Sequence, residues 1–274
     1  MENCAIAFIG CGNMARSLVG GLIANNIDKS RLIATDPDAG QRQKIKDQFG
    51  IETLADNHAA IDKADVLVLA IKPQVMPQVI KEIAADIRGK NKLVISIAAG
   101  IRIQSISTWL DSDEAIIRVM PNTPALIQVG AAALFANAHA TDAQKNLAES
   151  MLRSVGTAVW LDSEEQMDAV TALSGSGPAY FFYFMEAIEK AAMSLGLDEE
   201  MARLLTIETA VGTAKMALLS SHDPATLRQQ VTSPGGTTEQ ALKVFAEAGL
   251  DEIISKAMQA AKQRSIELSD TLGK

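Results

Sequence analysis

Aromatic residues, cysteines and clusters of basic residues are all scarce in this chain. Aromatics account for only 4% of its 274 residues, and its two cysteines, Cys4 and Cys11, fall in one short stretch. Two cysteines so placed build neither a disulfide framework nor a metal cluster, so we expect no metal site and a reducing, cytoplasmic setting. The net charge is −8 with no basic run, which disfavours a nucleic-acid partner because that partner requires a positive face.

Long hydrophobic runs are also missing. No segment stays apolar for the thickness of a bilayer, so we expect no membrane partner. The first residues lack a basic stretch before the first apolar run, which predicts that the chain has no signal peptide. Hydrophobic residues nevertheless make up 48% of the chain, mostly Ala, Ile, Leu, Val and Met. That content and length fit a globular protein with enough chain for two domains.

The most informative segment present is FIGCGNMA, residues 8–15. An apolar run leads into it and a helical pattern follows, so it predicts a G-x-G-x-x-A turn that binds a dinucleotide pyrophosphate. Gly10 permits the tight turn, Gly12 lets the phosphates approach the backbone, and Ala15 lets the helix pack closely on the strand. The free N–H groups of the helix would face the anion. A merely tight turn is the alternative, and Cys11 is either a reactive thiol or, the favoured interpretation, a small residue tolerated there.

Strands and helices alternate through the first part of the chain. Further strands are predicted at residues 31–35, 65–70, 92–97, 115–120, 130–135 and 157–161, with helices at 41–49 and 141–153. The run DVLVLA at 65–70 is continuously apolar, as a parallel strand buried on both faces should be. This alternation predicts an α/β protein with a Rossmann-type, doubly wound sheet and right-handed crossovers.

After about residue 164 the pattern becomes purely helical. Helices are predicted at residues 179–195, 199–220, 238–248 and 251–268. We therefore predict a dinucleotide-binding domain at 1–163 and an all-helical substrate-binding and dimerisation domain at 164–274. The helix at 179–195 is apolar on most faces, and a small bundle has little interior in which to bury it. We infer that it packs against a second subunit, so that the minimum unit is a homodimer and a higher homo-oligomer is open.

Loops after predicted strands or before predicted helices carry the remaining polar motifs. They are AIKP (70–73), MPNTP (120–124), LSGSGP (173–178) and SPGGTT (233–238). The last has two glycines and opens a helix, which is typical of a site for a carboxylate or phosphate. A capping box of Thr237 with Gln240 would explain only one of its threonines. Lys72 is equally a surface charge. For 120–124 a structural turn is the alternative, with function the favoured interpretation. The three histidines, His58, His139 and His222, are interpreted as surface or cap residues.

Six ordered segments together resemble the pyrroline-5-carboxylate reductase family along essentially the whole chain. They are FIGCGNMA (8–15), AIKP (70–73), SIAAG (96–100), RVMPNTPA (118–125), LSGSGPAY (173–180) and TSPGGTT (232–238). The resemblance implies NAD(P)H-dependent reduction of the cyclic imine L-1-pyrroline-5-carboxylate to L-proline, the last step of proline synthesis. Such an imine is electrophilic once its nitrogen is protonated, so the reaction requires neither a metal nor a nucleophile from the protein.

The resemblance also implies the site residues. The helix start would grip the substrate carboxylate, and the Thr238 hydroxyl, the candidate catalytic group, would bond the ring nitrogen. The substrate-binding positions are Ser233, Gly235, Gly236, Thr237 and Thr238. The cofactor-binding positions are Phe8, Ile9, Gly10, Cys11, Gly12, Asn13, Met14, Thr35, Asn57, Ala70, Ile71, Lys72, Pro73, Ile97, Ala98, Ala99, Asn122 and Thr123. Of these, Asn122 and Thr123 would border the nicotinamide.

The choice between NADPH and NADH is open on the residues alone. Asp36 lies 24 residues after Gly12, where a carboxylate binds the ribose of NAD and repels a 2′-phosphate. If Asp36 turns away, Thr35 and Asn57 could hold that phosphate, with Arg42 nearby. The resemblance favours NADPH, with NADH as the alternative.

Two other functions fit parts of the chain. A β-hydroxyacid dehydrogenase also joins a Rossmann domain to a helical one, but its catalytic lysine position holds Phe181 here and its asparagine position holds Met185. That replacement removes the proton-transfer group. A nucleotide-sensing protein without turnover is the other alternative, and residues 233–238 argue against it because a sensor needs no second anion site.

Overall fold

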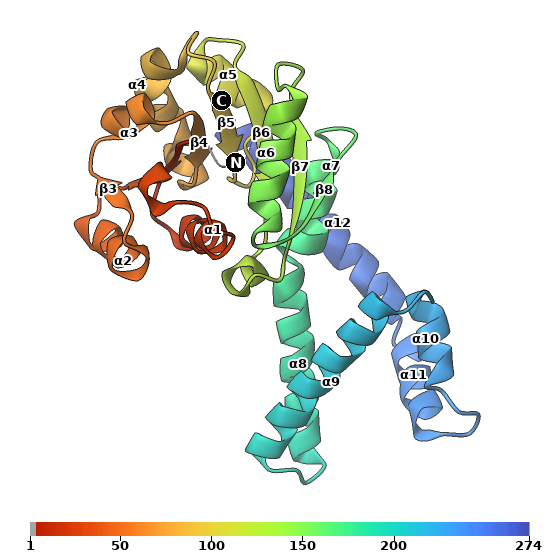
Figure 1. Cartoon of the computed structure of the whole chain (residues 1–274). Coiled ribbons are helices and arrows are strands. Elements are labelled where there is room, and N and C mark those ends of the chain that lie inside the picture. Colours follow the sequence, from red (N-terminus) through yellow and green to blue (C-terminus); the bar gives the residue numbers. More distant parts are fainter. Residues whose placement is uncertain (1–3, 274) are drawn as a thin grey trace. The chain divides into compact units, whose positions relative to one another are not determined.

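A single eight-stranded sheet organises the first part of the chain. The computed structural model describes residues 4–273 (Figure 1). The strand order is β3-β2-β1-β4-β5-β6-β7-β8. The strands are β1 (Ile6–Ile9), β2 (Leu32–Thr35), β3 (Glu52–Leu54), β4 (Val66–Leu69), β5 (Leu93–Ser96), β6 (Ala115–Met120), β7 (Gly130–Ala136) and β8 (Gly156–Trp160). β2 and β3 lie on one side of β1, and β4 to β8 lie on the other. This order confirms the predicted Rossmann-type sheet.

One strand pair departs from the parallel arrangement. β6 and β7 are antiparallel, with Met120 opposite Ala133, whereas β7 and β8 are parallel again. A parallel return needs a crossover of a dozen or more residues. The link between β6 and β7 holds only the 3₁₀ turn Thr123–Ile127, so the chain reverses there instead of crossing over. The short strand β3 was not predicted, because its three residues are not buried and carry no apolar run.

Helices cover both faces of this sheet. They are α1 (Asn13–Ala24), α2 (Ala39–Phe49), α3 (Asn57–Lys63), α4 (Met76–Ile87), α5 (Ile103–Leu110), α6 (Asp142–Arg153) and α7 (Gln166–Val170). Thr141 caps the start of α6 and forms a capping box with Gln144. The sequence analysis did not predict α3, α4 or α7.

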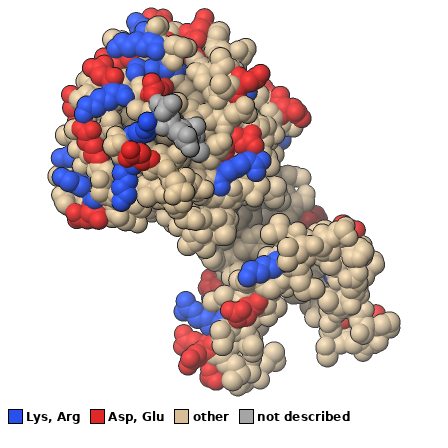
Figure 2. Space-filling model, viewed as in Figure 1, with Lys and Arg blue, Asp and Glu red and all other residues tan. Residues whose placement is uncertain are grey.

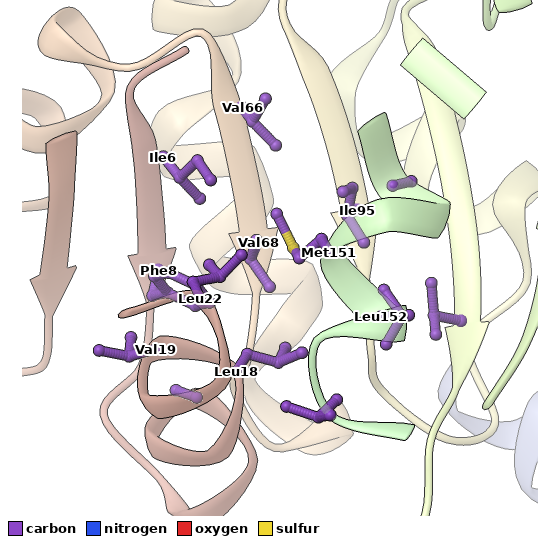
Figure 3. Packing of buried hydrophobic residues seen from close by; sticks show 14 of the residues in the cluster. Ile6, Phe8, Leu18, Val19, Leu22, Val66, Val68, Ile95, Met151 and Leu152 are labelled. Atoms are coloured by element: carbon purple, nitrogen blue, oxygen red, sulfur yellow. The ribbon is translucent and has the colours of Figure 1, made fainter. Parts of the chain in front are cut away.

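The core lies in two layers, one on each face of the sheet. Figure 3 shows the first, in which Phe8 of β1 and Val68 of β4 pack against Leu18 and Leu22 of α1 and Met151 of α6. The second layer lies under α3, α4 and α5. Each fully buried aliphatic or phenylalanine side chain contributes about 1.5–3 kcal/mol. These two layers therefore hold β1, β4 and β5 rigidly, and with them the loops that leave their carboxyl ends.

The chain divides into two compact units. The sheet unit comprises Met1–Ser176 and Ala260–Lys274, and the helical unit comprises Gly177–Gln259. The sheet unit thus includes the end of α12 (Leu250–Leu272), where the Ser265 hydroxyl donates to a buried Asp168 carboxylate oxygen at 2.7 Å. The predicted division at 163/164 remains a prediction, and residues 1–3 and 274 of its two ranges lie outside the described residues.

The helical unit has almost no interior of its own. It contains α8 (Gly177–Ser194), α9 (Glu199–Leu219), α10 (Pro224–Gln230), α11 (Thr237–Glu247) and the beginning of α12. Within residues 177–259 only Gly177, Ala202 and Thr206 are buried. The aromatic run of α8, residues 180–184, is exposed, and Phe181 keeps 68% of its surface. In the view of Figure 2, α8 to α11 present mostly uncharged atoms, whereas charged side chains are dense over the sheet unit.

Candidate nucleotide and substrate sites

Contacts within the chain require a glycine at the first position of the turn between β1 and α1. Gly10 has φ +107°, and a Cβ there would lie 2.5 Å from the carbonyl oxygen of Ala70. Its N–H donates to the Thr35 carbonyl at 2.7 Å, so the turn is clamped between the ends of β2 and β4. Any side chain at this position would push those strand ends apart.

Gly12 is different, because nothing within the chain demands a glycine there. Its φ of −69° suits any residue, and a Cβ would meet no atom of the chain within 4 Å. The space in front of Gly12 is therefore open. Gly12 is also the N-cap of α1, which has no side-chain cap and no acidic residue in its first turn. Open space before uncapped helix amides fits a pyrophosphate group.

Buried residues lie on both sides of this turn in the chain. Ala15 is buried, as predicted, where it lets α1 lie close to the sheet. Phe8 and Ile9 are likewise fully buried, so their contribution to a bound nucleotide would run through the backbone. Asn13 and Gly12 are exposed, and the Asn13 side chain accepts from the Arg16 guanidinium at 2.5 Å. A cation thus lies one turn into the helix whose N-terminus faces the open space.

Cys11 is an inert thiol. Its side chain is fully buried and its Sγ lies 3.5 Å from the Thr35 carbonyl oxygen. Burial, followed by the nearby Asp36 carboxylate, raises the pKa of this thiol to about 12. Because only the thiolate is a good nucleophile, this environment favours the small-residue interpretation over the reactive one.

The end of β2 carries a hydrogen-bonded group of polar side chains. Thr35 is fully buried, and its hydroxyl donates to the Asn57 side-chain oxygen at 2.6 Å. Asp36 accepts the Cys11 N–H at 2.9 Å through one carboxylate oxygen and the Asp38 N–H at 2.9 Å through the other. The guanidinium of Arg42 donates to the carbonyl of Asp36 at 2.6 Å. Among these contacts, the bond from the Cys11 N–H to Asp36 joins the group to the glycine-rich turn.

Two more segments with predicted cofactor-binding residues leave the sheet beside Gly10. The Ala70 N–H donates to the Ile9 carbonyl at 2.9 Å, and the Ile97 N–H donates to the Leu69 carbonyl at 3.3 Å. The ends of β1, β4 and β5 are therefore aligned, and the loops at 70–73 and 97–99 follow them directly. Ala98 is buried, Ala99 and Lys72 are exposed, and Ile71, Pro73 and Met14 are half-buried.

The Asn122 side chain has a structural task. Its NH₂ group donates to the Ser174 carbonyl at 3.0 Å, and its oxygen accepts the Ala131 N–H at 2.9 Å. Asn122 thus ties the loop after β6 to β7 and to the turn before α8. Thr123, next to it, is exposed. The structural-turn interpretation of this loop accounts for Asn122, and the border with the nicotinamide remains a prediction for both residues.

An ion pair between the buried Arg118 and the half-buried Glu164 was not identified from the sequence. Arg118 of β6 contacts a carboxylate oxygen of Glu164 at 2.9 Å, and the same oxygen accepts the Ile103 N–H at 2.9 Å. Only 4% of the Arg118 side chain is exposed. The signal was present as a single charge inside the apolar strand AIIRVM, since a buried charge must find a partner. This pair fixes the strand from which the 120–124 loop departs.

The loop at 233–238 lies in the helical unit and begins α11. The suggested capping box of Thr237 with Gln240 is wrong, because the N-cap is Gly236 and no side chain caps the helix. Instead the Glu239 carboxylate accepts the Gly235 N–H at 2.8 Å, and the Gly236 N–H donates to the Ser233 carbonyl at 3.0 Å. Gly235 has φ +72°, which favours glycine. No side chain caps the first-turn amides of α11, and the Glu239 carboxylate lies in that turn.

The three histidines lie at or near the surface, as expected. His58 in α3 is half-buried, and its ring contacts the Asp86 carboxylate of α4, which raises the histidine pKa. His139 and His222 are exposed. Among residues 4–273 there is no group of three His, Cys, Asp or Glu side chains that could hold a metal ion. No helix in the same range is long and apolar enough to cross a membrane.

Comparison with known proteins assigns both parts of the chain. A family described as "Pyrroline-5-carboxylate reductase dimerisation" matches residues 164–268, and one described as "NADP oxidoreductase coenzyme F420-dependent" matches residues 5–100. The pyrroline-5-carboxylate reductase of Pseudomonas aeruginosa is 49% identical over 273 residues, covering 100% of both chains. That of Vibrio alginolyticus is 45% identical over 98% of each.

Solved structures give the same assignment. A pyrroline-5-carboxylate reductase from Coxiella burnetii superposes with a TM-score of 0.93 at 46% identity, covering 98% of this chain and 99% of that one. A Plasmodium falciparum pyrroline carboxylate reductase with NADP bound superposes with a TM-score of 0.88 at 29% identity over 98% and 99% of the two chains. The glycine-rich turn, the uncapped start of α1 and the likeness over the full length agree: this chain belongs to the pyrroline-5-carboxylate reductase family.

Proposed function

We propose that this protein reduces L-1-pyrroline-5-carboxylate to L-proline with NAD(P)H. The observation that carries the proposal is an open, uncapped glycine-rich turn in a chain that matches reductases of this name from end to end. A bound nicotinamide nucleotide would supply the hydride. The remaining tasks, which are to bind the imine, orient it and stabilise its changing charge, fall to residues of this chain.

One region would bind the nucleotide and another would bind the substrate. The turn at residues 10–14 would hold the nucleotide pyrophosphate against the start of α1, while the loops at 70–73 and 97–99 line the aligned strand ends beside it. The start of α11 would bind the substrate carboxylate, because its first-turn amides are uncapped. Ser233, Thr237 and Thr238 add hydroxyl groups to that helix start.

Thr238 is the proposed catalytic contact. It is the second residue of α11, and its hydroxyl would bond the ring nitrogen as the iminium becomes an amine. An interaction of this kind accelerates the reaction only if it is stronger in the transition state than with the bound imine. The alternative of a β-hydroxyacid dehydrogenase is disfavoured because Phe181 occupies the position of that group's catalytic lysine.

A homodimer is the proposed minimum unit. The matched dimerisation family covers residues 164–268, and the helical unit has three buried residues of its own while its long helices expose Phe181, Leu204 and Leu218. Apolar faces of this extent require a partner. The cysteine content supports a cytoplasmic location, and both Cys4 and Cys11 are free thiols.

A steady-state assay tests the central proposal. The purified full chain is mixed with NADH or NADPH and the cyclic imine, and nucleotide oxidation and proline formation are followed together. Equal amounts of oxidised nucleotide and proline are expected. Nucleotide binding without turnover would instead favour the sensor. In a parallel assay with NAD⁺ or NADP⁺, oxidation of 3-hydroxy acids by a chain that leaves the imine unreduced would favour the dehydrogenase. Between the two nucleotides, the resemblance favours NADPH, and the residues at the end of β2 bear on that choice.

A further inference from the structure

The carboxylate of Asp36 is held in place beside the glycine-rich turn. One of its oxygens accepts the Cys11 N–H and the other accepts the Asp38 N–H, each at 2.9 Å. Two backbone donors from opposite sides leave the side chain little freedom to rotate. Cys11 lies between Gly10 and Gly12, so the negative charge sits directly against the segment proposed to receive the nucleotide.

Two neighbouring groups that could offset this charge or hold a phosphate form hydrogen bonds within the chain. The Arg42 guanidinium donates to the carbonyl oxygens of Asp36 at 2.6 Å and of Pro37 at 3.0 Å. It is therefore directed at the backbone of this segment. The Thr35 hydroxyl is fully buried and donates to Asn57 at 2.6 Å, so it presents nothing outward for a phosphate.

In dinucleotide-binding folds the end of the second strand faces the adenosine ribose. A carboxylate there accepts hydrogen bonds from the ribose hydroxyls of NAD, whereas a nearby arginine accommodates the 2′-phosphate of NADP. Here the carboxylate is held by two backbone N–H groups, and the Arg42 Nη1 is bonded to backbone carbonyls. A 2′-phosphate entering this site would meet a like charge, and like charges in close contact at a protein surface repel strongly.

We propose that Asp36 determines the nucleotide choice of this protein and directs it toward NADH. The inference rests on the proposed use of NAD(P)H and departs from the preference for NADPH that the family resemblance implies. Asp36 acts in two ways: it offers an acceptor to the ribose hydroxyls of NADH and opposes the 2′-phosphate of NADPH. Arg42 holds the backbone that carries it.

The test measures binding of NAD⁺ and NADP⁺ to the full chain by calorimetry, without imine. Wild type should bind NAD⁺ more tightly than NADP⁺. Asp36→Asn removes the charge and keeps an acceptor oxygen, so the affinity ratio of NADP⁺ to NAD⁺ should rise about ten- to a hundredfold. The matched control is Asp38→Asn, which removes the same charge two residues further on. Asp38 is exposed and caps α2 through Gly40 and Gln41, a role that asparagine also fills. Its ratio should change less than about threefold, because exposed charges at longer range are screened.

Three results would overturn the inference. Tighter binding of NADP⁺ than of NAD⁺ by wild type would do so at once, even if the Asp36 variant did not fold. An equal change of the ratio in both aspartate variants would show that net charge matters and position does not. Loss of NADP⁺ binding in Arg42→Gln without loss of NAD⁺ binding would assign the 2′-phosphate to Arg42. Because no imine is present, a failure of the proposed reductase activity would leave these results unaffected.

Discussion

The role of Thr238 can be tested by separating a contribution to turnover from a contribution to folding. Thr238 is half-buried at the second position of α11, whose N-cap is Gly236 and which has no side-chain cap. If Thr238 capped the helix, its replacement by alanine would cost up to about 2 kcal/mol of stability. Because Gly236 and not Thr238 is the N-cap, this loss of stability is not expected. Alanine is the better helix former by up to about 0.7 kcal/mol, so Thr238→Ala should be as stable as wild type or slightly more stable.

Turnover should respond in the opposite way. Losing one hydrogen bond to the ring nitrogen in the transition state costs about 1–3 kcal/mol. That corresponds to roughly a ten- to hundredfold decrease in kcat/KM for the imine. Thermal unfolding and steady-state kinetics on the same preparation measure both quantities. Nucleotide affinity should stay unchanged, because the nucleotide cradle lies in the sheet unit.

Two further variants at the same position identify the group responsible. Thr238→Ser keeps the hydroxyl and should retain most of kcat/KM, whereas Thr238→Val keeps the branched shape and should behave like alanine. A destabilised alanine variant with full kcat/KM would refute the catalytic assignment and return Thr238 to a structural role. A serine variant as impaired as alanine would show that shape matters and the hydroxyl does not.

Three other predictions concern the anion loop, the assembly and a surface histidine. Gly236→Val places a Cβ about 2.9 Å from the Ser233 carbonyl oxygen, so the loop must open. The KM for the imine should rise while the affinity for the nucleotide stays unchanged. Equal losses of imine and nucleotide affinity would contradict the assignment of the loop. The exposed apolar faces of α8 and α9 should be covered by a second copy, so sedimentation should detect at least a dimer, and a stable active monomer at micromolar concentration would exclude this. His58→Gln should lower stability by at most about 1 kcal/mol below pH ~6.5, where the wild-type histidine is charged beside Asp86. Because the contact raises the folded-state pKa of His58, this contribution to stability is lost as pH rises through that pKa. Denaturant unfolding of wild type and variant at two pH values should show that their difference in stability vanishes at the higher pH. A stability difference that persists at high pH would assign the effect to packing.

The sequence by itself determined the elements with a strong local signal. The apolar runs that became β4 and β5 are buried on both faces and could be recognised without a partner strand. The G-x-G-x-x-A spacing predicted the turn, because it joins two elements that are adjacent in the chain and Gly10 supplies the positive φ that it needs. The capping box of Thr141 with Gln144 is equally local, because it joins residues three positions apart.

Only the tertiary structure decided features that depend on residues far apart in the chain. The antiparallel direction of β7, the return of the end of α12 to Asp168 and the pairing of Arg118 with Glu164 all join distant segments. Nor could the pattern around 233–240 show that Glu239, and not Gln240, folds back on the loop. The same holds for Asp36: its spacing from Gly12 was readable, but whether its carboxylate turned toward the glycine-rich turn depended on a hydrogen bond that forms only when β1 and β2 pair. Hydrogen bonds and burial between distant segments are properties of the folded chain, because they arise only once the sheet has brought those segments together.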